Sequence, residues 1–115
     1  MINFHSYHAD GSDDVIVVEL SGHLDTDAAE QFFNRLDVEI SKGHRKLVFD
    51  CQKLEYISSL GFGMMIRGHS RVQKEGGAVR FARLHGLILE AFQIVGFHKL
   101  FQNYSTIKEA AESFD

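Results

Sequence analysis

The sequence lacks proline altogether and has one cysteine, Cys51, among its 115 residues. A single cysteine cannot close an internal disulfide, and because Cys51 follows an apolar run we expect a reduced thiol that lines the core. Without proline, the breaks between helices and strands must come from glycine and from short polar clusters. We therefore place the ends of the expected elements at such positions.

Long hydrophobic runs and an excess of basic charge are also missing. No apolar run approaches the roughly 20 residues that a membrane-spanning helix needs, and no basic, apolar leader precedes the first expected strand. The formal net charge is −4, whereas a nucleic-acid surface needs a basic stripe. These absences argue against membrane insertion and against direct nucleic-acid binding, and we expect a cytoplasmic protein.

Length and composition indicate one globular domain. A chain of 115 residues is long enough for one real core and too short for two. Hydrophobic residues make up 44% of the sequence, which is too many for a disordered chain. We therefore treat residues 1–115 as a single domain.

Hydrophobic periodicity predicts strands that alternate with helices. We expect strands over residues 2–8, 15–20, 46–50 and 79–84, and a short last strand at 101–104. Asp27 and Glu30 have the spacing of a capping box, so the first helix is expected to begin there and to stop at Lys42 and Gly43. Further helices are expected at about 59–75, at about 86–95, and after a cap at Thr106.

This order predicts an α/β fold. The first two strands are expected to pair as a hairpin, and the later alternation implies parallel pairing with right-handed crossovers. We predict a mixed sheet of four to five strands with about four helices, packed mainly on one face.

The stretch between the third strand and the second helix is the centre of the chain. Leu47-Val48-Phe49 is a continuous apolar run, typical of a strand buried on both faces. Ser58 and Ser59 lie where the next helix begins, at the positive end of its dipole. Both can be simple caps for the orphan amides, or one can cap while the other reacts.

The second helix contains three glycines, Gly61, Gly63 and Gly68. Each costs about 1 kcal/mol relative to alanine in a helix interior, so something should compensate. Close packing of the helix on the sheet is one explanation. A surface without side chains, where a partner can approach the backbone, is the other, and both can hold.

Known enzyme signatures are incomplete. Gly61-Phe62-Gly63 starts like a dinucleotide fingerprint but lacks the third glycine in register. Ser70 lies in the middle of an expected helix and lacks the closing glycine of a nucleophile elbow. The histidines are scattered, and His5 and His8 should point to opposite faces of a strand. We predict no enzyme, no metal site and no cofactor.

The chain resembles STAS domains, and within them the single-domain anti-sigma factor antagonists of bacterial partner-switching systems. The resemblance covers nearly the whole chain and rests on the order and spacing of five segments. They are Leu20-Ser21-Gly22-His23-Leu24-Asp25, Leu47-Val48-Phe49-Asp50, Leu54-Glu55-Tyr56-Ile57-Ser58-Ser59-Leu60-Gly61-Phe62-Gly63, Gly76-Gly77 and Val95-Gly96-Phe97-His98-Lys99-Leu100-Phe101.

The resemblance implies a phosphorylation site. In such antagonists the central loop usually reads Asp-Ser-Ser-Gly, and a partner anti-sigma kinase phosphorylates the first serine. Alignment on Gly61 places Ser59 at the acceptor, Ser58 at the usual aspartate and Leu60 at the second serine. Ser58 is the alternative acceptor, because the usual carboxylate beside the acceptor is lost.

The resemblance also implies partners. The unphosphorylated protein is expected to bind an anti-sigma factor that is a serine kinase of the GHKL ATPase type and to release its client, with a PP2C-type phosphatase as a further partner. The residues implied in this contact are Asp25, Ser58, Leu60, Gly61, Phe62, Gly63 and Met64. At least one of Phe62 and Met64 should be accessible as an apolar anchor. The alternative is a non-switching STAS scaffold or subunit of a sensory or lipid-transport assembly.

Overall fold

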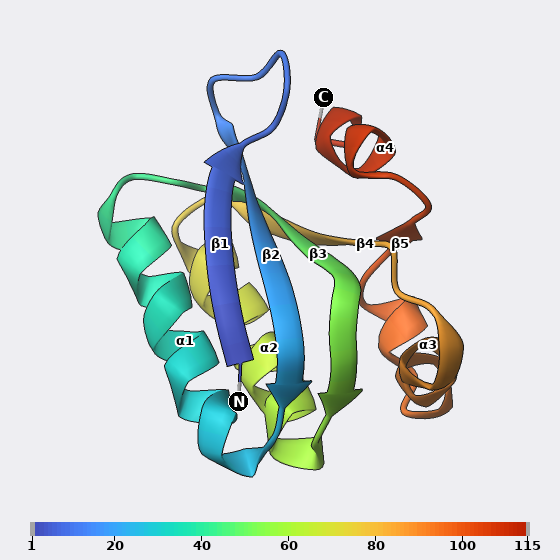
Figure 1. The fold of residues 1–115 in the computed structure, drawn as a ribbon. Coiled ribbons are helices and arrows are strands. Elements are labelled where there is room, and N and C mark those ends of the chain that lie inside the picture. Colours follow the sequence, from blue (N-terminus) through green and yellow to red (C-terminus); the bar gives the residue numbers. More distant parts are fainter. Residues whose placement is uncertain (1, 115) are drawn as a thin grey trace.

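A five-stranded sheet in the order β1-β2-β3-β4-β5 forms the middle of the computed structural model, which describes residues 2–114 (Figure 1). β1 pairs antiparallel with β2, and every later pairing is parallel. The predicted mixed sheet and the predicted first hairpin are confirmed. The strands are β1 Ile2–His8, β2 Val15–Leu24, β3 Lys46–Ile57, β4 Ala78–Ala82 and β5 Asn103–Tyr104.

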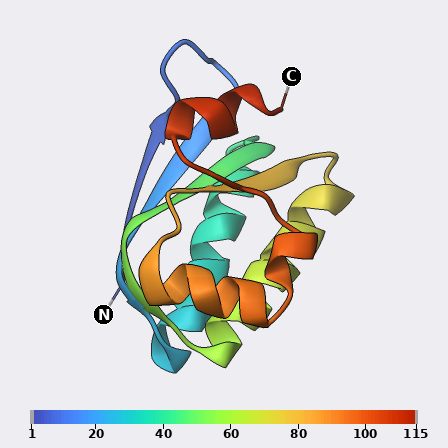
Figure 2. The ribbon, with the colours of Figure 1, turned by 90° about the vertical axis from the view of Figure 1, so that its right-hand side faces the viewer.

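Helices cover both faces of the sheet, but unequally. The described helices are α1 Thr26–Ser41, α2 Ser59–Lys74, α3 Gly86–Ile94 and α4 Ile107–Glu112, with a 3-10 turn, η1, at Phe97–Lys99. Apolar residues of α1, α2, α3 and η1 share one large core with the sheet. α4 alone covers the other face, over a smaller cluster around Val17 and Val48 (Figure 2). The prediction of helices mainly on one face is confirmed.

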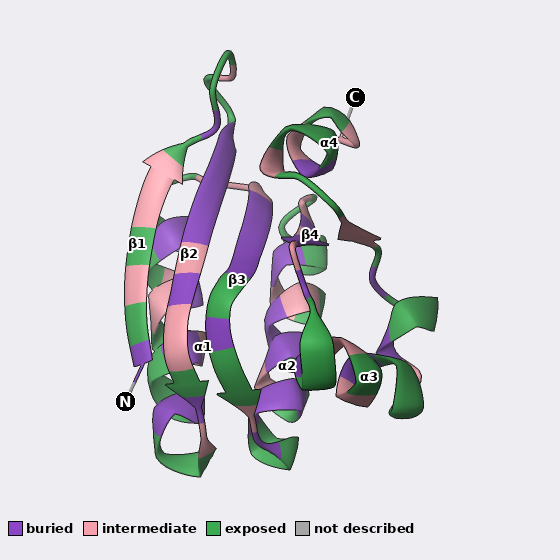
Figure 3. Ribbon diagram, turned by 45° about the vertical axis from the view of Figure 1, so that its right-hand side comes forward, coloured by how far each residue is buried: buried purple, intermediate pink, exposed green. Residues whose placement is uncertain are grey.

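The first halves of β2 and β3 are buried on both sides, as the apolar run of β3 predicts (Figure 3). Leu47, Val48 and Phe49 are each at most 3% exposed. Cys51 lies in the same strand and is buried, and burial together with the charge of Asp50 raises the pKa of its thiol. The thiol is therefore protonated and unreactive at neutral pH.

Both central strands are longer than predicted. β2 continues past the expected break at Gly22 to Leu24, because Gly22 adopts a φ of 100° at a shift in the β2–β3 register. β3 continues past Asp50 to Ile57. An aspartate is a typical strand end, but Asp50 is fully buried here because its carboxylate is paired with the guanidinium of Arg83.

The predicted start of the first helix is wrong. α1 begins at Thr26, and its cap is Asp25, whose Oδ1 accepts a hydrogen bond from the amide of Ala28 at 2.9 Å. Asp27 and Glu30 are both exposed. Aspartates occur at both 25 and 27, and the capping-box spacing to Glu30 favours Asp27. The actual cap is Asp25, because it directly follows the end of β2 at Leu24.

The last helix begins where its sequence predicts. Thr106 Oγ1 accepts from the amide of Glu109 at 3.1 Å and donates to the Glu109 carboxylate at 3.1 Å.

The remaining boundaries differ from the predicted ones by a few residues. β4 spans 78–82, because Arg83 leaves the strand with a positive φ of 61°. Between residues 2 and 114 no helix combines the length and the apolar character needed to cross a bilayer.

His69, on α2, has a buried nitrogen without a partner. Its ring meets the edge of Phe101 with centroids 4.8 Å apart, and its Nδ1 has no hydrogen bond. Burial, with the nearby charge of Arg80, lowers the pKa of His69 below its ordinary value. In acid, His69 therefore binds a proton more readily in the unfolded chain than in the folded one. This difference lowers the free energy of unfolding as the pH falls below about 6.5.

We expect His69→Phe to remove this pH dependence, because a phenyl ring keeps the contact with Phe101 and has nothing to protonate. Urea unfolding at pH 7.5 and pH 5.5 would measure it: the free energy of unfolding of the wild type should fall more than that of the variant. Equal losses in the two proteins would show that other groups carry the acid sensitivity.

Candidate functional site

Two helix N-termini lie next to each other at one end of the sheet. β2 and β3 end at Leu24 and Ile57, and α1 and α2 begin just beyond them, at the bottom of Figure 1. A backbone hydrogen bond from the amide of Ser58 to the carbonyl of Leu24, 2.8 Å long, joins the two turns. The resemblance placed Asp25, Ser58 and Ser59 near one another, and the fold brings both turns together.

Ser58 is the N-cap of α2. Its Oγ accepts a hydrogen bond from the amide of Gly61 at 3.0 Å, and the residue is only 8% exposed. The cap leaves the hydroxyl facing into the domain. Of the two serines that the sequence offers as caps, Ser58 is the one that caps the helix.

Ser59 is the first residue of α2 and is exposed. The amides of Ser59 and Leu60 precede the first hydrogen bond that the helix can make, since the first four amides of any helix have no carbonyl partner within it. These amides and the helix dipole favour negative charge at this end. A phosphoryl group on Ser59 therefore has an environment that fits it.

The other residues implied in partner contact divide into exposed and buried ones. Leu60 is 46% exposed, Gly63 is exposed and Met64 is partly exposed. Gly61 is buried against Leu24. Phe62 is 8% exposed, with its ring 4.8 Å from that of Phe97, so it belongs to the core. The expectation of an accessible apolar anchor is met only partly, by Met64, while Leu60 is the more exposed side chain.

A groove of about 390 Å³ runs between α1 and α2 and begins at Leu60, the residue after Ser59. The guanidinium of Arg67 lies over the ring of Phe33 there, 4.5 Å from its centroid. Neither residue is among those that the sequence analysis assigns to the site, because hydrophobic periodicity does not show which residues of two helices meet. The groove is lined by Ala29, Glu30, Phe33, Asn34, Asp37, Leu60, Met64 and Arg67.

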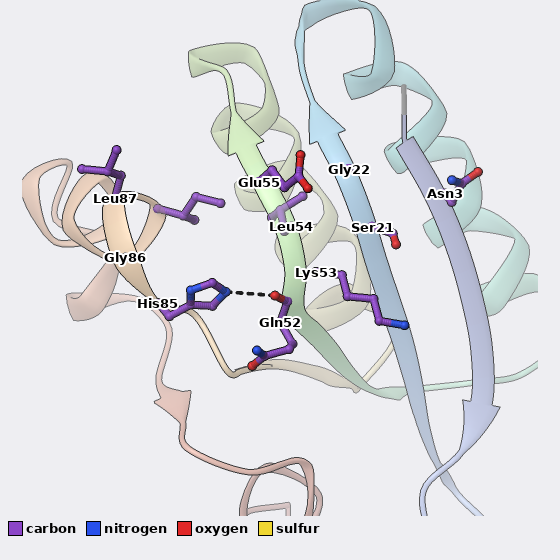
Figure 4. Close-up of a pocket in the computed structure, with 11 residues that line it drawn as sticks. Asn3, Ser21, Gly22, Gln52, Lys53, Leu54, Glu55, His85, Gly86 and Leu87 are labelled. Atoms are coloured by element: carbon purple, nitrogen blue, oxygen red, sulfur yellow. Dashed lines mark hydrogen bonds between the residues drawn. The ribbon is translucent and has the colours of Figure 1, made fainter.

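A wider, open groove of about 750 Å³ lies between the ends of β2 and β3 and the start of α3 (Figure 4). The hydrogen bond drawn among its residues joins Nε2 of His85 to the backbone oxygen of Gln52 at 2.9 Å. Lys53, also in its lining, is paired with Glu19. Among the residues that line this groove, no serine is hydrogen-bonded to a histidine or a carboxylate side chain. Within residues 2–114 no three His, Cys, Asp or Glu side chains are grouped to hold a metal ion.

Comparison with known proteins gives matches over nearly the whole chain. The family model described as STAS domain matches residues 6–110. BtrV of Bordetella bronchiseptica, named as a candidate anti-sigma factor antagonist, is 29% identical over 105 residues, which are 91% of this chain and 90% of that protein.

Solved structures share the fold. A candidate anti-sigma factor antagonist from Thermotoga maritima aligns with a TM-score of 0.86 at 21% identity, over 96% of this chain and 92% of that one. The phosphorylated form of SpoIIAA, a Bacillus cell fate determinant, aligns with a TM-score of 0.71 at 19% identity, over 98% of this chain and 100% of that one.

Proposed function

The chain belongs to the STAS domain family, and from that membership we propose that it is an anti-sigma factor antagonist that works as a phosphorylation-controlled partner switch. The observation that carries the proposal is the contrast between two adjacent serines. Ser58 is buried as a cap, whereas Ser59 is exposed at the start of α2. The relatives named as anti-sigma factor antagonists support the same role.

In the unphosphorylated state, the start of α2 and the groove beside it dock on the partner. Leu60 and Met64 supply apolar contact, and Gly63 lets the partner approach the helix backbone, since nothing lies within 4 Å of the position where its Cβ would be. The partner is a serine kinase of the GHKL ATPase type that acts as an anti-sigma factor. Docking releases the client of that kinase.

Phosphorylation of Ser59 ends the docking by adding charge. A phosphoserine carries roughly −1.5 to −2 charges at pH 7, and the α2 N-terminus accommodates it within the domain. The partner surface must desolvate or repel that charge. A penalty of about 3 kcal/mol weakens a complex about a hundredfold, so a small mismatch is enough. Because Ser59 is exposed, a PP2C-type phosphatase can reach and reverse the modification.

The test is site mapping with a GHKL-type kinase captured on the immobilised chain. With ATP, the wild type should gain one phosphate by intact mass. Ser58→Ala should still gain it, although loss of the cap should lower stability by about 1 kcal/mol, and Ser59→Ala should not. Phosphate found on residue 58 in the Ser59→Ala variant, at the wild-type rate, would contradict the assignment.

A second function is favoured by the loop itself. Ser58 stands where the resemblance puts a carboxylate, and the exposed Leu60 stands where it puts a second serine. Such a loop also fits a STAS scaffold or subunit that does not switch, in a sensory or lipid-transport assembly. Absence of phosphate on the wild type, together with capture of transporter subunits in place of a kinase, would select this alternative.

A further inference from the structure

β1 leaves one long edge of the sheet open. It is the first strand in the order β1-β2-β3-β4-β5, so only its β2 side is paired (Figure 3). β1 spans Ile2–His8, whereas β5 at the opposite edge has two residues. Of the two strands that end the sheet, β1 is therefore the one long enough to accept another strand.

The register shows which backbone groups face outward. The amide of Ala9 donates to the carbonyl of Val15 at 2.9 Å, and the β1–β2 pairing continues without a shift to Ile2 opposite Gly22. Hydrogen-bonded pairs alternate along an antiparallel ladder. The odd-numbered residues of β1 therefore bond to β2, and the even-numbered ones, Ile2, Phe4, Ser6 and His8, direct their amides and carbonyls to the open edge.

This edge lacks the usual protection against pairing. Natural edge strands are blunted by lysine, proline, bulges or inward charges. β1 has the sequence INFHSYH, which contains no proline and no residue with a full charge at neutral pH, and its register has no bulge. Two copies of β1 can therefore approach each other without like-charge repulsion between their own side chains, and the nearby charge of Arg35 is paired with Glu39 at 3.3 Å.

We propose that the open edge of β1 pairs with β1 of a second copy of this chain, antiparallel about a twofold axis beside His5. Only the register centred on His5 matches every outward residue with an outward residue, Ile2 with His8 and Phe4 with Ser6 of the other copy. Antiparallel self-pairing is isologous and closes at two copies, and the two-residue β5 offers no second edge for growth. This inference is independent of Ser59 and goes beyond the proposed function.

α1 adds side-chain contact beside the same edge. Arg35 donates to the Ser6 hydroxyl at 2.8 Å, which places its side of α1 next to β1. Val38, three residues later, lies on the neighbouring part of the helix surface and is 45% exposed. An exposed valine next to an open strand edge suits an apolar contact between the α1 helices of two copies.

Light scattering after size exclusion, at pH 8 and up to about 0.5 mM chain, tests the proposal. We expect a mass near 26 kDa, twice the 13.0 kDa of one chain. Hydrogen exchange should show the same pairing at individual backbone amides of β1. The amides of Phe4, Ser6 and His8 should become more protected as protein concentration rises, while those of Asn3, His5 and Tyr7, bonded within the monomer, should not change.

His5→Lys should give a monomer. His5 is exposed, so the substitution leaves the core intact, and the new ammonium faces Glu19 across the ladder in its own copy. In the dimer two ammonium groups would meet across the axis, where opposed like charges are destabilising. His23→Lys is the matched control. It makes the same change of charge beside Glu55, on β2 far along from His5, and should remain dimeric.

A wild-type mass of 13 kDa at every concentration up to about 0.5 mM would overturn the proposal. So would a dimer that persists in His5→Lys with concentration-independent exchange at Phe4 and Ser6, because the contact would then lie elsewhere. If His5→Lys failed to fold, the exchange pattern of the wild type would still decide.

Discussion

Replacing Arg83 with alanine is expected to lower the free energy of unfolding by about 3 kcal/mol, at the lower end of the 3–5 kcal/mol typical of breaking a buried ion pair. Arg83 donates from Nε and Nη2 to the two oxygens of Asp50, at 2.9 and 2.6 Å. The hydrogen bond to Asp50 raises the pKa of Arg83, although burial opposes the shift. Asp50 is fully buried, so its carboxylate would lose this partner while still in the interior.

The lower end of the range applies because Arg83 is 36% exposed, and water can enter when its side chain is removed. Urea unfolding measures the loss. Lys53→Ala is the matched control on the same sheet, since Lys53 pairs with Glu19 while 64% exposed, and an exposed pair contributes less than about 1 kcal/mol.

The backbone of Arg83 supplies a second comparison. Its φ of 61° is costly for any residue with a Cβ. Arg83→Gly should therefore be less destabilising than Arg83→Ala, by up to about 1 kcal/mol. If both variants lost less than about 1 kcal/mol of stability, the ion pair would contribute little. Equal and large losses would mean that the backbone is not strained.

Replacing two glycines of α2 with alanine should change the stability of the domain in opposite directions. A Cβ on Gly61 would lie 2.8 Å from the carbonyl oxygen of Leu24. That oxygen cannot swing away, because it is backbone and already accepts from Ser58. Overpacking typically costs 1–3 kcal/mol, and alanine regains only about 1 kcal/mol of helix propensity. Gly61→Ala should therefore lose up to about 2 kcal/mol of stability.

Gly63→Ala should instead stabilise the domain by up to about 1 kcal/mol. Nothing lies within 4 Å of the position where its Cβ would be, and the residue is exposed. Thermal and urea unfolding of the two variants side by side would measure the difference. The prediction would be wrong if both substitutions moved stability in the same direction.

These glycines also show how much of the packing can be predicted from the sequence. Three helical glycines indicate that some compensation exists, but packing and partner access remain equal explanations. The fold separates them. A Cβ on Gly61 would lie 2.8 Å from Leu24 and one on Gly68 would lie 2.6 Å from Leu36, while a Cβ on Gly63 would meet nothing within 4 Å. Such contacts depend on residues more than 30 positions away, which local patterns do not encode.

The same limit applied to the strands and the site. Local chemistry was sufficient for the Thr106 cap and for the buried run in β3, because each depends on neighbours in sequence. It failed for the length of β3, because Asp50 remains in the strand only through Arg83, 33 residues later. The groove between α1 and α2 was not predicted either, since it exists only where the two helices pack together.

The capping of α2 by Ser58 separates the integrity of the domain from the chemistry of its neighbour. The Ser58 hydroxyl holds the first turn whether or not Ser59 is modified, since the two side chains share no hydrogen bond among those of the described residues. The phosphorylation proposed for Ser59 would therefore leave the helix folded. Amide NMR spectra recorded before and after that modification should differ only around the first turn of α2, because the proposed switch changes the surface charge and leaves the fold as it is.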